Sequence, residues 1–388
     1  MRPLYAVQFE VARSDGTTPA TLRAEVLSRV LNWISEWYLS RKGVKIHPPL
    51  NVGPVSPVFG HDLEVLQDVS DESQVSHSVV SWSYPEDNDG NLFWSSRVEI
   101  GEFGGLVEFS YQLSFDSTQY LIAPVEFSLR RPRIVGDLLQ EFTCSCGGAT
   151  LSLDAKEIEV GQVQDFVTDR LLAHTRRLPI VLVSRTTLSD KLIIDPTRLS
   201  SQLAGIAETY CLADKWASFA LTDCVGKLYS CYNGAVRVYW PAFYPSGTPV
   251  SQVYLPESLN DSGERLTDNL FRQFASISAF RFARGPVTTD AWEHLFEKRR
   301  RETEELKAAA SERGDLDQLL ELADIENRDI KKKNDQLQDE VRSLQARLEL
   351  AQDNFRAIQL SHGEIEWGTG PTDAKSESEG LGNLCAGA

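Results

Sequence analysis

The 388-residue sequence lacks the segments that target a protein to a membrane or across it. Residues 1–16 alternate as a strand does and contain no basic stretch followed by an apolar one, so we expect no secretory signal. No stretch approaches the roughly 18 uninterrupted apolar residues that span a bilayer. These absences predict a cytoplasmic protein with no membrane partner.

Cysteine is scarce, with six residues that are neither dense nor regularly spaced. This usage favours buried, reduced thiols. Cys144 and Cys146 form a C-x-C that could begin a zinc site, which needs about four ligands. No second C-x-x-C or C-x-x-H pair occurs, although Cys211, Cys224 and Cys231 could complete the site in space. We therefore expect no metal and no cofactor, with Cys144 and Cys146 as the metal candidates.

Signatures of nucleophilic and phosphate-binding enzymes are also absent. None of the six histidines lies in a G-x-S-x-G context, and no Walker A loop occurs. Ser184 follows an apolar strand, where open α/β sheets hold functional residues, and Arg237 could bind an anion. A turn role for Ser184 and a local ion pair for Arg237 are the alternatives. Asp154, Glu157 and Glu159 near Lys156 resemble the charged residues of a metal-dependent nuclease site, but they also fit an ordinary exposed strand or loop. A hydrolase or nuclease with its site at these strand ends is the competing hypothesis.

Positive charge is outnumbered, with 39 Lys and Arg against 56 Asp and Glu and a net charge of −17. Such a balance does not attract nucleic acid to the protein as a whole. The densest basic run, 298–301, precedes Glu302 and further glutamates, which favours i,i+4 pairing along an exposed helix. Its members are the candidates for phosphate contact in a third hypothesis, a nucleic-acid sensor: Lys298, Arg299, Arg300 and Arg301.

Two folded modules are expected before the C-terminal region. Residues 1–142 predict an α+β module: a strand at 4–11, a helix after Thr18-Pro19, a proline-rich loop over 45–75, and a meander of strands at 79–84, 92–100, 106–115 and 119–129. The alternation of apolar and polar residues with a period of two predicts that one face of this antiparallel sheet is exposed to solvent. Residues 143–288 predict an α/β module with strands at 178–183, 208–212 and 235–240 and helices at 160–175, 195–206, 216–225 and 266–282.

The C-terminal region has an unbroken heptad over residues 316–358. The d positions are Leu316, Ala323, Ile330, Leu337, Leu344, Ala351 and Ile358; the a positions are Leu320, Asn327, Asn334, Val341, Leu348 and Phe355. A repeat of about 3.5 residues keeps these residues on one seam of a left-handed supercoil. Asn at a favours a parallel two-stranded pairing, and Glu326 at g with Lys331 at e′ agrees with it. We expect a helical stalk over 289–360, a hinge near Gly314 and a disordered tail at 361–388.

Three segments resemble a group of poorly characterised bacterial proteins: 178–184 (LPIVLVS), 195–207 with its DP and GIA, and 234–241 (GAVRVYWP). Such proteins often end in a coiled coil, and the resemblance implies an accessory component of a defence-type locus, with no catalytic residues to transfer. The leading hypothesis is therefore a homodimeric protein-interaction component of a bacterial multi-protein system of the antiviral defence type. Its partners would be a second copy of the chain and another protein of that system.

Overall fold

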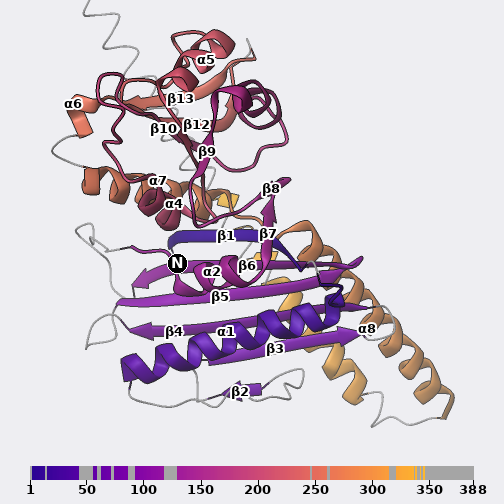
Figure 1. Cartoon of the computed structure of the whole chain (residues 1–388). Coiled ribbons are helices and arrows are strands. Elements are labelled where there is room, and N and C mark those ends of the chain that lie inside the picture. The colour runs from indigo at the N-terminus through magenta and orange to yellow at the C-terminus, as the bar shows by residue number, and fades with distance from the viewer. Residues whose placement is uncertain are drawn as a thin grey trace, which may run out of the picture. The chain divides into compact units, whose positions relative to one another are not determined.

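The computed structural model describes residues 2–13, 15–42, 56–58, 63–70, 74–85, 92–117, 129–244, 247–259, 263–313, 320–335, 337–338, 341 and 344–345. It has two compact units, residues 1–302 and 303–388. The fold is mixed α/β with a large antiparallel sheet, as expected (Figure 1). Within the described ranges no helix has the length and apolar content to cross a membrane.

The first sheet has eight strands in the order β2-β3-β4-β5-β6-β1-β7-β8, and every pairing is antiparallel. The strands are β1 (Arg2–Ala12), β2 (Ser56–Val58), β3 (Leu63–Ser70), β4 (Val75–Pro85), β5 (Leu92–Phe103), β6 (Leu106–Ser117), β7 (Thr143–Cys146) and β8 (Ala149–Thr150). The sheet thus continues past residue 142, where the sequence suggested a domain boundary.

One face of this sheet is covered by α1 (Pro19–Lys42), as Figure 1 shows. The helix begins after Thr18, whose Oγ1 accepts a hydrogen bond from the Thr21 N–H at 3.3 Å. Its apolar stripe faces the strands, and the Trp33 ring lies edge-on to Trp82 and Tyr111. Helical spacing alone was enough to predict this contact face.

The second sheet has the order β13-β12-β10-β11-β9 and is mixed. β10 (Ile180–Val183) runs parallel to β11 (Glu208–Leu212) and antiparallel to β12 (Val236–Phe243); β9 (Lys156–Ile158) and β13 (Pro249–Tyr254) lie at the edges. Its helical segments are η1 (Val160–Gln162), α3 (Val163–Asp165), η2 (Phe166–Leu171), α4 (Pro196–Leu203) and α5 (Lys215–Val225). α4 has the expected N-cap, because the Asp195 carboxylate accepts from the N–H groups of Thr197 and Arg198.

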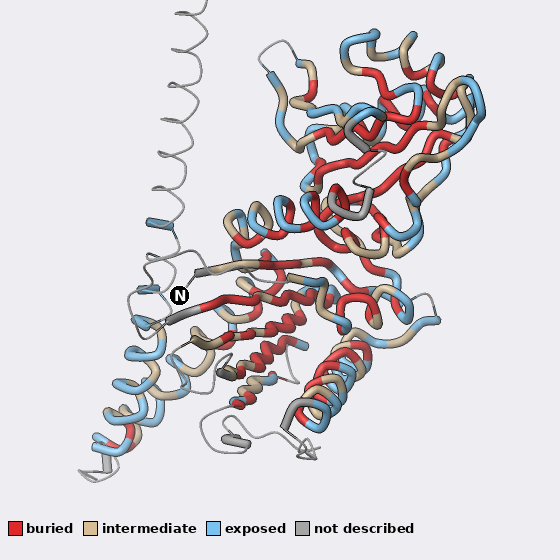
Figure 2. Tube along the Cα trace, turned by 90° about the vertical axis from the view of Figure 1, so that its left-hand side faces the viewer, coloured by how far each residue is buried: buried red, intermediate tan, exposed pale blue. Residues whose placement is uncertain are grey.

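A shared apolar core joins the two sheets (Figure 2). α7 (Gly263–Arg281) contributes Phe271, which stacks on Tyr5 of β1 with ring centroids 6.0 Å apart, and Phe274, whose ring lies 5.2 Å from that of Trp240. The short α6 (Pro256–Leu259) precedes it. Close contact continues at Gly205, where an added Cβ would lie 2.6 Å from Val7 Cγ2.

Two strands of the first sheet were not predicted from the sequence. β2 and β3 lie within residues 45–75, which were expected to be mostly loop; most of the other residues of that stretch lie outside the described ranges. The prolines misled the interpretation: Pro57 belongs to the edge strand β2, where a missing N–H is tolerated, and β3 contains none. The predicted strand 119–129 lies, apart from residue 129, outside the described residues.

The face predicted to be wet is covered by α8 (Pro286–Arg313) along its first turns, on the side opposite α1 (Figures 1 and 2). Glu99 and Glu108 are consequently buried, and both have partners. Glu108 Oε2 accepts from the N–H and the Oγ1–H of Thr288 at 2.9 Å each, and its Oε1 accepts from Gln8 Nε2 at 2.6 Å. A sheet carboxylate therefore caps the first turn of α8.

Glu99 fixes the segment just before α8. Arg284 Nε donates to it at 2.8 Å, Arg97 Nε at 2.6 Å, and His77 Nε2 lies 3.3 Å away. Burial alone would raise the pKa of Glu99, but Arg97, the His77 hydrogen bond and Arg284 outweigh burial and hold that pKa well below its usual range. The ionised carboxylate is the form that folding stabilises.

We expect Gly205→Ala to destabilise the fold more than Gly105→Ala. Both glycines have positive φ, +86° and +82°, but an added Cβ meets Val7 only at Gly205 and meets nothing within 4 Å at Gly105. A side chain at positive φ costs about 1–2 kcal/mol at each site, and the collision adds about 1–3 kcal/mol at Gly205. Urea unfolding of both variants measures the difference. Equal losses would show that the Val7 contact is not tight.

Glu99→Gln should lower the free energy of unfolding at pH 7 by about 3 kcal/mol, the low end for a broken buried ion pair, because Arg97 and Arg284 keep partial access to water. A depressed folded pKa stabilises the fold above the unfolded value of about 4.3, and this contribution is lost as the pH falls. The gap between wild type and variant should therefore narrow from pH 7 to pH 3 in urea titrations. Glu64→Gln, at an exposed carboxylate, is the control; a gap independent of pH would contradict the assignment.

Candidate functional site

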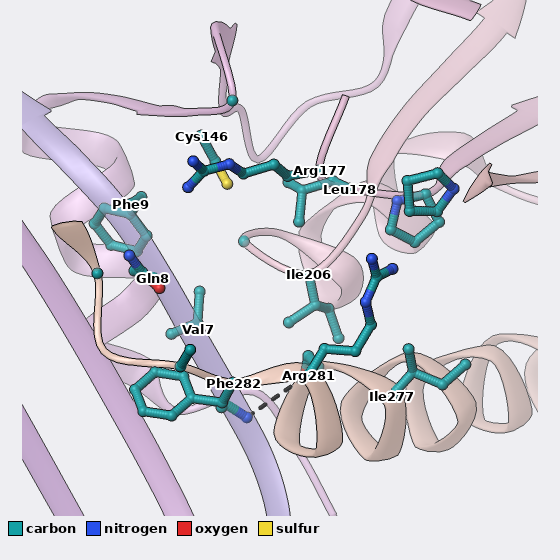
Figure 3. Close-up of a pocket in the computed structure, with 18 of the residues that line it drawn as sticks. Val7, Gln8, Phe9, Cys146, Arg177, Leu178, Ile206, Ile277, Arg281 and Phe282 are labelled. Carbon is teal, nitrogen blue, oxygen red and sulfur yellow. Dashed lines mark hydrogen bonds between the residues drawn. The ribbon is translucent and has the colours of Figure 1, made fainter. Parts of the chain in front are cut away.

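A cavity of about 500 Å³ lies within unit 1–302, where β1, α7 and the second sheet meet (Figure 3). All three segments quoted for the bacterial resemblance contribute to its wall, through Leu178-Pro179, Gly205-Ile206 and Trp240-Pro241. The first and last of these are adjacent because β10 and β12 are antiparallel, with Ile180 opposite Tyr239. Residues far apart in the sequence thus form one concave surface.

Arg176 holds this wall together. Its guanidinium is buried and donates to the carbonyl oxygens of Tyr239 at 2.7 Å, Trp240 at 2.8 Å and Leu178 at 3.3 Å. Nε is also buried and has no partner in the described part of the chain. Burial lowers the pKa of Arg176 to about 10, so the group stays cationic at neutral pH. A positive charge is therefore kept at the cavity, with the Nε–H unused.

Two further arginines reach the cavity from different elements. Arg177 extends beside Cys146, and Arg281, at the end of α7, extends upward between Ile206 and Ile277 (Figure 3). The Arg177 stem packs at the β7–β8 turn, where a Cβ on Gly147 would lie 3.0 Å from its Cγ. Neither guanidinium has an ion pair or hydrogen bond among the described residues. Both are exposed and able to bind an anion.

The rest of the lining is partly apolar and partly polar. Val7, Leu178, Ile206, Ile277 and Phe282 supply the apolar part, and Gln8, Glu10, Glu108, Ser145 and Ser278 the polar part. Cys146 is there too, but burial raises the pKa of its thiol to about 11 despite the opposing effect of Arg177. The thiol is neutral at pH 7 and is a poor nucleophile. The cavity thus has the groups for binding rather than for covalent chemistry.

The catalytic candidates lie at the other end of β10. Ser184 is fully buried, and its Oγ donates to the Ala235 carbonyl at 3.0 Å. Arg237 is also buried, donates to the Leu228 carbonyl at 2.7 Å and to Ser251 Oγ at 3.2 Å, and lies over the Tyr239 ring. The two side chains are on neighbouring strands, and each is used in local structure.

The metal candidates do not gather ligands. The Cys144 thiol is buried and donates to the Leu138 carbonyl at 3.8 Å, and burial raises its pKa to about 12. No group of three or more His, Cys, Asp or Glu side chains suited to a metal ion occurs among the described residues. In the nuclease-like stretch, the Lys156 ammonium donates to the Thr150 carbonyl at 2.8 Å and lies over the Tyr210 ring.

The basic run on α8 faces carboxylates and polar groups. Lys298 donates to Ser70 Oγ at 2.9 Å, Arg299 pairs with Asp68 at 2.9 Å, and Arg300 pairs with Glu297 at 3.0 Å. Arg301 is exposed. Three of the four candidates for phosphate contact are thus already engaged within unit 1–302.

The described part of the heptad leaves its large apolar side chains exposed. The exposed fractions are 68% for Leu320, 52% for Ile330, 48% for Leu337, 51% for Val341 and 52% for Leu344. Asn327 and Asn334 are exposed, and Ala323 is half-buried. Leu316, Leu348, Ala351, Phe355 and Ile358, together with Gly314 and the tail 361–388, lie outside the described residues.

The residues of the cavity were missed because its parts come from distant segments. The available signal was the Arg176-Arg177 pair directly before the apolar strand 178–183, together with Arg281 just ahead of Gly285-Pro286. Comparison with known proteins adds no assignment, since no protein-family model, no curated protein and no solved structure matches this chain.

Proposed function

We propose that this protein is a homodimeric interaction component, paired by a parallel coiled coil over residues 316–358. A second copy of the chain would cover the seam, and the folded unit 1–302 would contact another protein of the same system. The resemblance of residues 178–241 favours a bacterial system of the antiviral defence type. The observation that supports pairing most directly is the exposure of the apolar heptad positions in a single chain.

These exposed side chains form one stripe because they occupy only a and d positions. Monomeric proteins seldom leave such a row of large apolar residues open to water. Burying each of them against a partner would contribute about 1.5–3 kcal/mol. A second copy fits this stripe because the heptad is regular and each Asn at a can pair with its own equivalent.

Among the described residues of unit 303–388, the contacts formed leave the large apolar side chains of this stripe exposed. Lys307 of α8 forms an ion pair with Glu326, and Leu322 and Ala310 are 7% and 1% exposed. Residues 307 and 326 lie symmetrically about the connection 314–319, which is the pairing of an antiparallel helical hairpin. Leu322 is at c, away from the a/d seam, whereas Glu326 is at g, which flanks the seam. The hairpin therefore leaves the large apolar a and d side chains exposed and shares Glu326 with a dimer.

The Lys307–Glu326 ion pair affects which residues would set the register between the two chains of the dimer. Glu326 is engaged by Lys307, so its expected interchain partner Lys331 competes with an existing contact. Asn327 and Asn334 then become the main determinants of alignment, at a cost in stability that all-apolar layers would not have.

A matched pair of isoleucines tests the dimer. Ile330 is at d on the seam and Ile325 is at f on the opposite side, and both are exposed in the single chain. Ile330→Arg should weaken association by about 100-fold or more, because two buried side chains are lost per dimer, whereas Ile325→Arg should leave the mass in solution unchanged. Light scattering of the full chain at micromolar concentration measures both. A monomeric wild type, or equal effects of the two variants, would refute the proposal.

The asparagine layers lead to a separate prediction. Replacing Asn327 and Asn334 together by Leu should tighten association and relax its specificity, giving mixtures of dimers and larger oligomers. Analytical ultracentrifugation resolves these species, and Gln338→Leu, at an e position, serves as the comparison. A weaker dimer in the double variant would mean that these asparagines do not face each other.

A further inference from the structure

We infer that the arginine-lined cavity of unit 1–302 is a binding site for a nucleoside monophosphate. The site is independent of the proposed dimer, because its lining residues all lie between Ala6 and Pro286. Four features support the inference: the charge of the lining, the unused donors, the division of the wall into polar and apolar parts, and the size of the cavity.

The cavity is positive in an acidic protein. Four arginines line it, Arg176, Arg177, Arg281 and Arg284, against the two carboxylates of Glu10 and Glu108, whereas the whole chain has a net charge of −17. Arg284 is neutralised by Glu99, which leaves three guanidiniums without carboxylate partners among the described residues. Positive charge concentrated in a concave surface attracts and retains anions.

Guanidinium groups favour a phosphate among anions. Their planar fork donates two parallel hydrogen bonds to a tetrahedral oxyanion and is always charged. Arg177 and Arg281 have all their donors available, and Arg176 adds a buried Nε without a partner. A dianionic phosphate would accept hydrogen bonds from an exposed guanidinium of this lining and offset the positive charge of the cavity.

Besides the arginines that would bind the phosphate, the lining offers separate surfaces for a sugar and a base. Gln8, Glu10 and Ser145 can exchange hydrogen bonds with hydroxyl groups, and Ile206, Ile277 and Phe282 form an apolar surface that Figure 3 shows around Arg281. Aromatic and apolar side chains pack against planar rings irrespective of their hydrogen-bonding pattern. The volume of about 500 Å³ is within the range of sites for ligands of this size.

Ligand binding would also bridge three parts of the fold. The wall comes from the first sheet, the second sheet and the connection between α7 and α8. A ligand that bridges them binds the folded state alone and raises its stability by mass action. Thermal unfolding is therefore a second readout of occupancy, and it does not depend on an activity.

The test is calorimetric titration of the full chain with AMP, GMP, CMP and UMP, with each matching nucleoside as the uncharged control. We expect at least one nucleotide to bind at millimolar concentration or below and its nucleoside to bind about tenfold more weakly or worse. Arg177→Gln and Arg281→Gln should each weaken binding by about tenfold. Arg272→Gln, an exposed arginine of α7 outside the cavity, should not change it.

Binding should also raise the melting temperature of wild type and not that of the Arg177→Gln, Arg281→Gln double variant. Both arginines are exposed and unpaired among the described residues, so the variants should fold; circular dichroism confirms this before titration. The inference is overturned if no nucleotide binds at concentrations up to about 5 mM, which is roughly five times the upper end of usual substrate levels. It is also overturned if nucleoside and nucleotide bind equally, or if the double variant binds as wild type does.

Discussion

The carboxylate of Glu108 is the contact on which much of the architecture depends. It accepts hydrogen bonds from Gln8 on β1 and from the first turn of α8 at Thr288, so one buried anion joins the sheet to the start of a long helix. The favourable field at a helix N-terminus and the three donors offset the cost of burying the charge. Gly285 lies so close to Gln8 and Glu108 that no side chain fits there, and the same residues border the cavity.

One face of the first sheet is polar but is covered by α8, which explains why the sequence pattern predicted a solvent-exposed face. Alternation along β6 places Val107, Phe109 and Tyr111 against the α1 side and Glu108 and Ser110 on the other. A period of two is the same whether the second face meets water or a helix encoded about 180 residues later. Paired polar side chains allow that burial, since the carboxylates of Glu99 and Glu108 both accept hydrogen bonds there. Local pattern identifies the strands and their inward side, but not what covers the outward side.

Short-range signals were accurate where the physics is short-range. The Asp195 cap and strand 208–212 lie where the sequence placed them, because capping and apolar runs depend on neighbouring residues. The cavity depends instead on antiparallel pairing of β10 with β12, which brings Trp240 to the start of β10. Attention to Ser184, at the end of β10, therefore led to the opposite end of the strand. No local rule states which end of a buried strand will border a cavity.

The two faces of the C-terminal helix show how one sequence can meet two requirements. Leu322 and Glu326 serve the contact with α8, while Leu320 and Ile330 stay exposed. α8 itself spans both units, since it begins at Pro286 beside Glu108 and ends at Arg313. The capped start fixes the register of α8 on the sheet. In the proposed dimer, the asparagines of the seam would fix the register between the two chains in the same way. Each arrangement accepts the cost of burying polar groups in exchange for alignment.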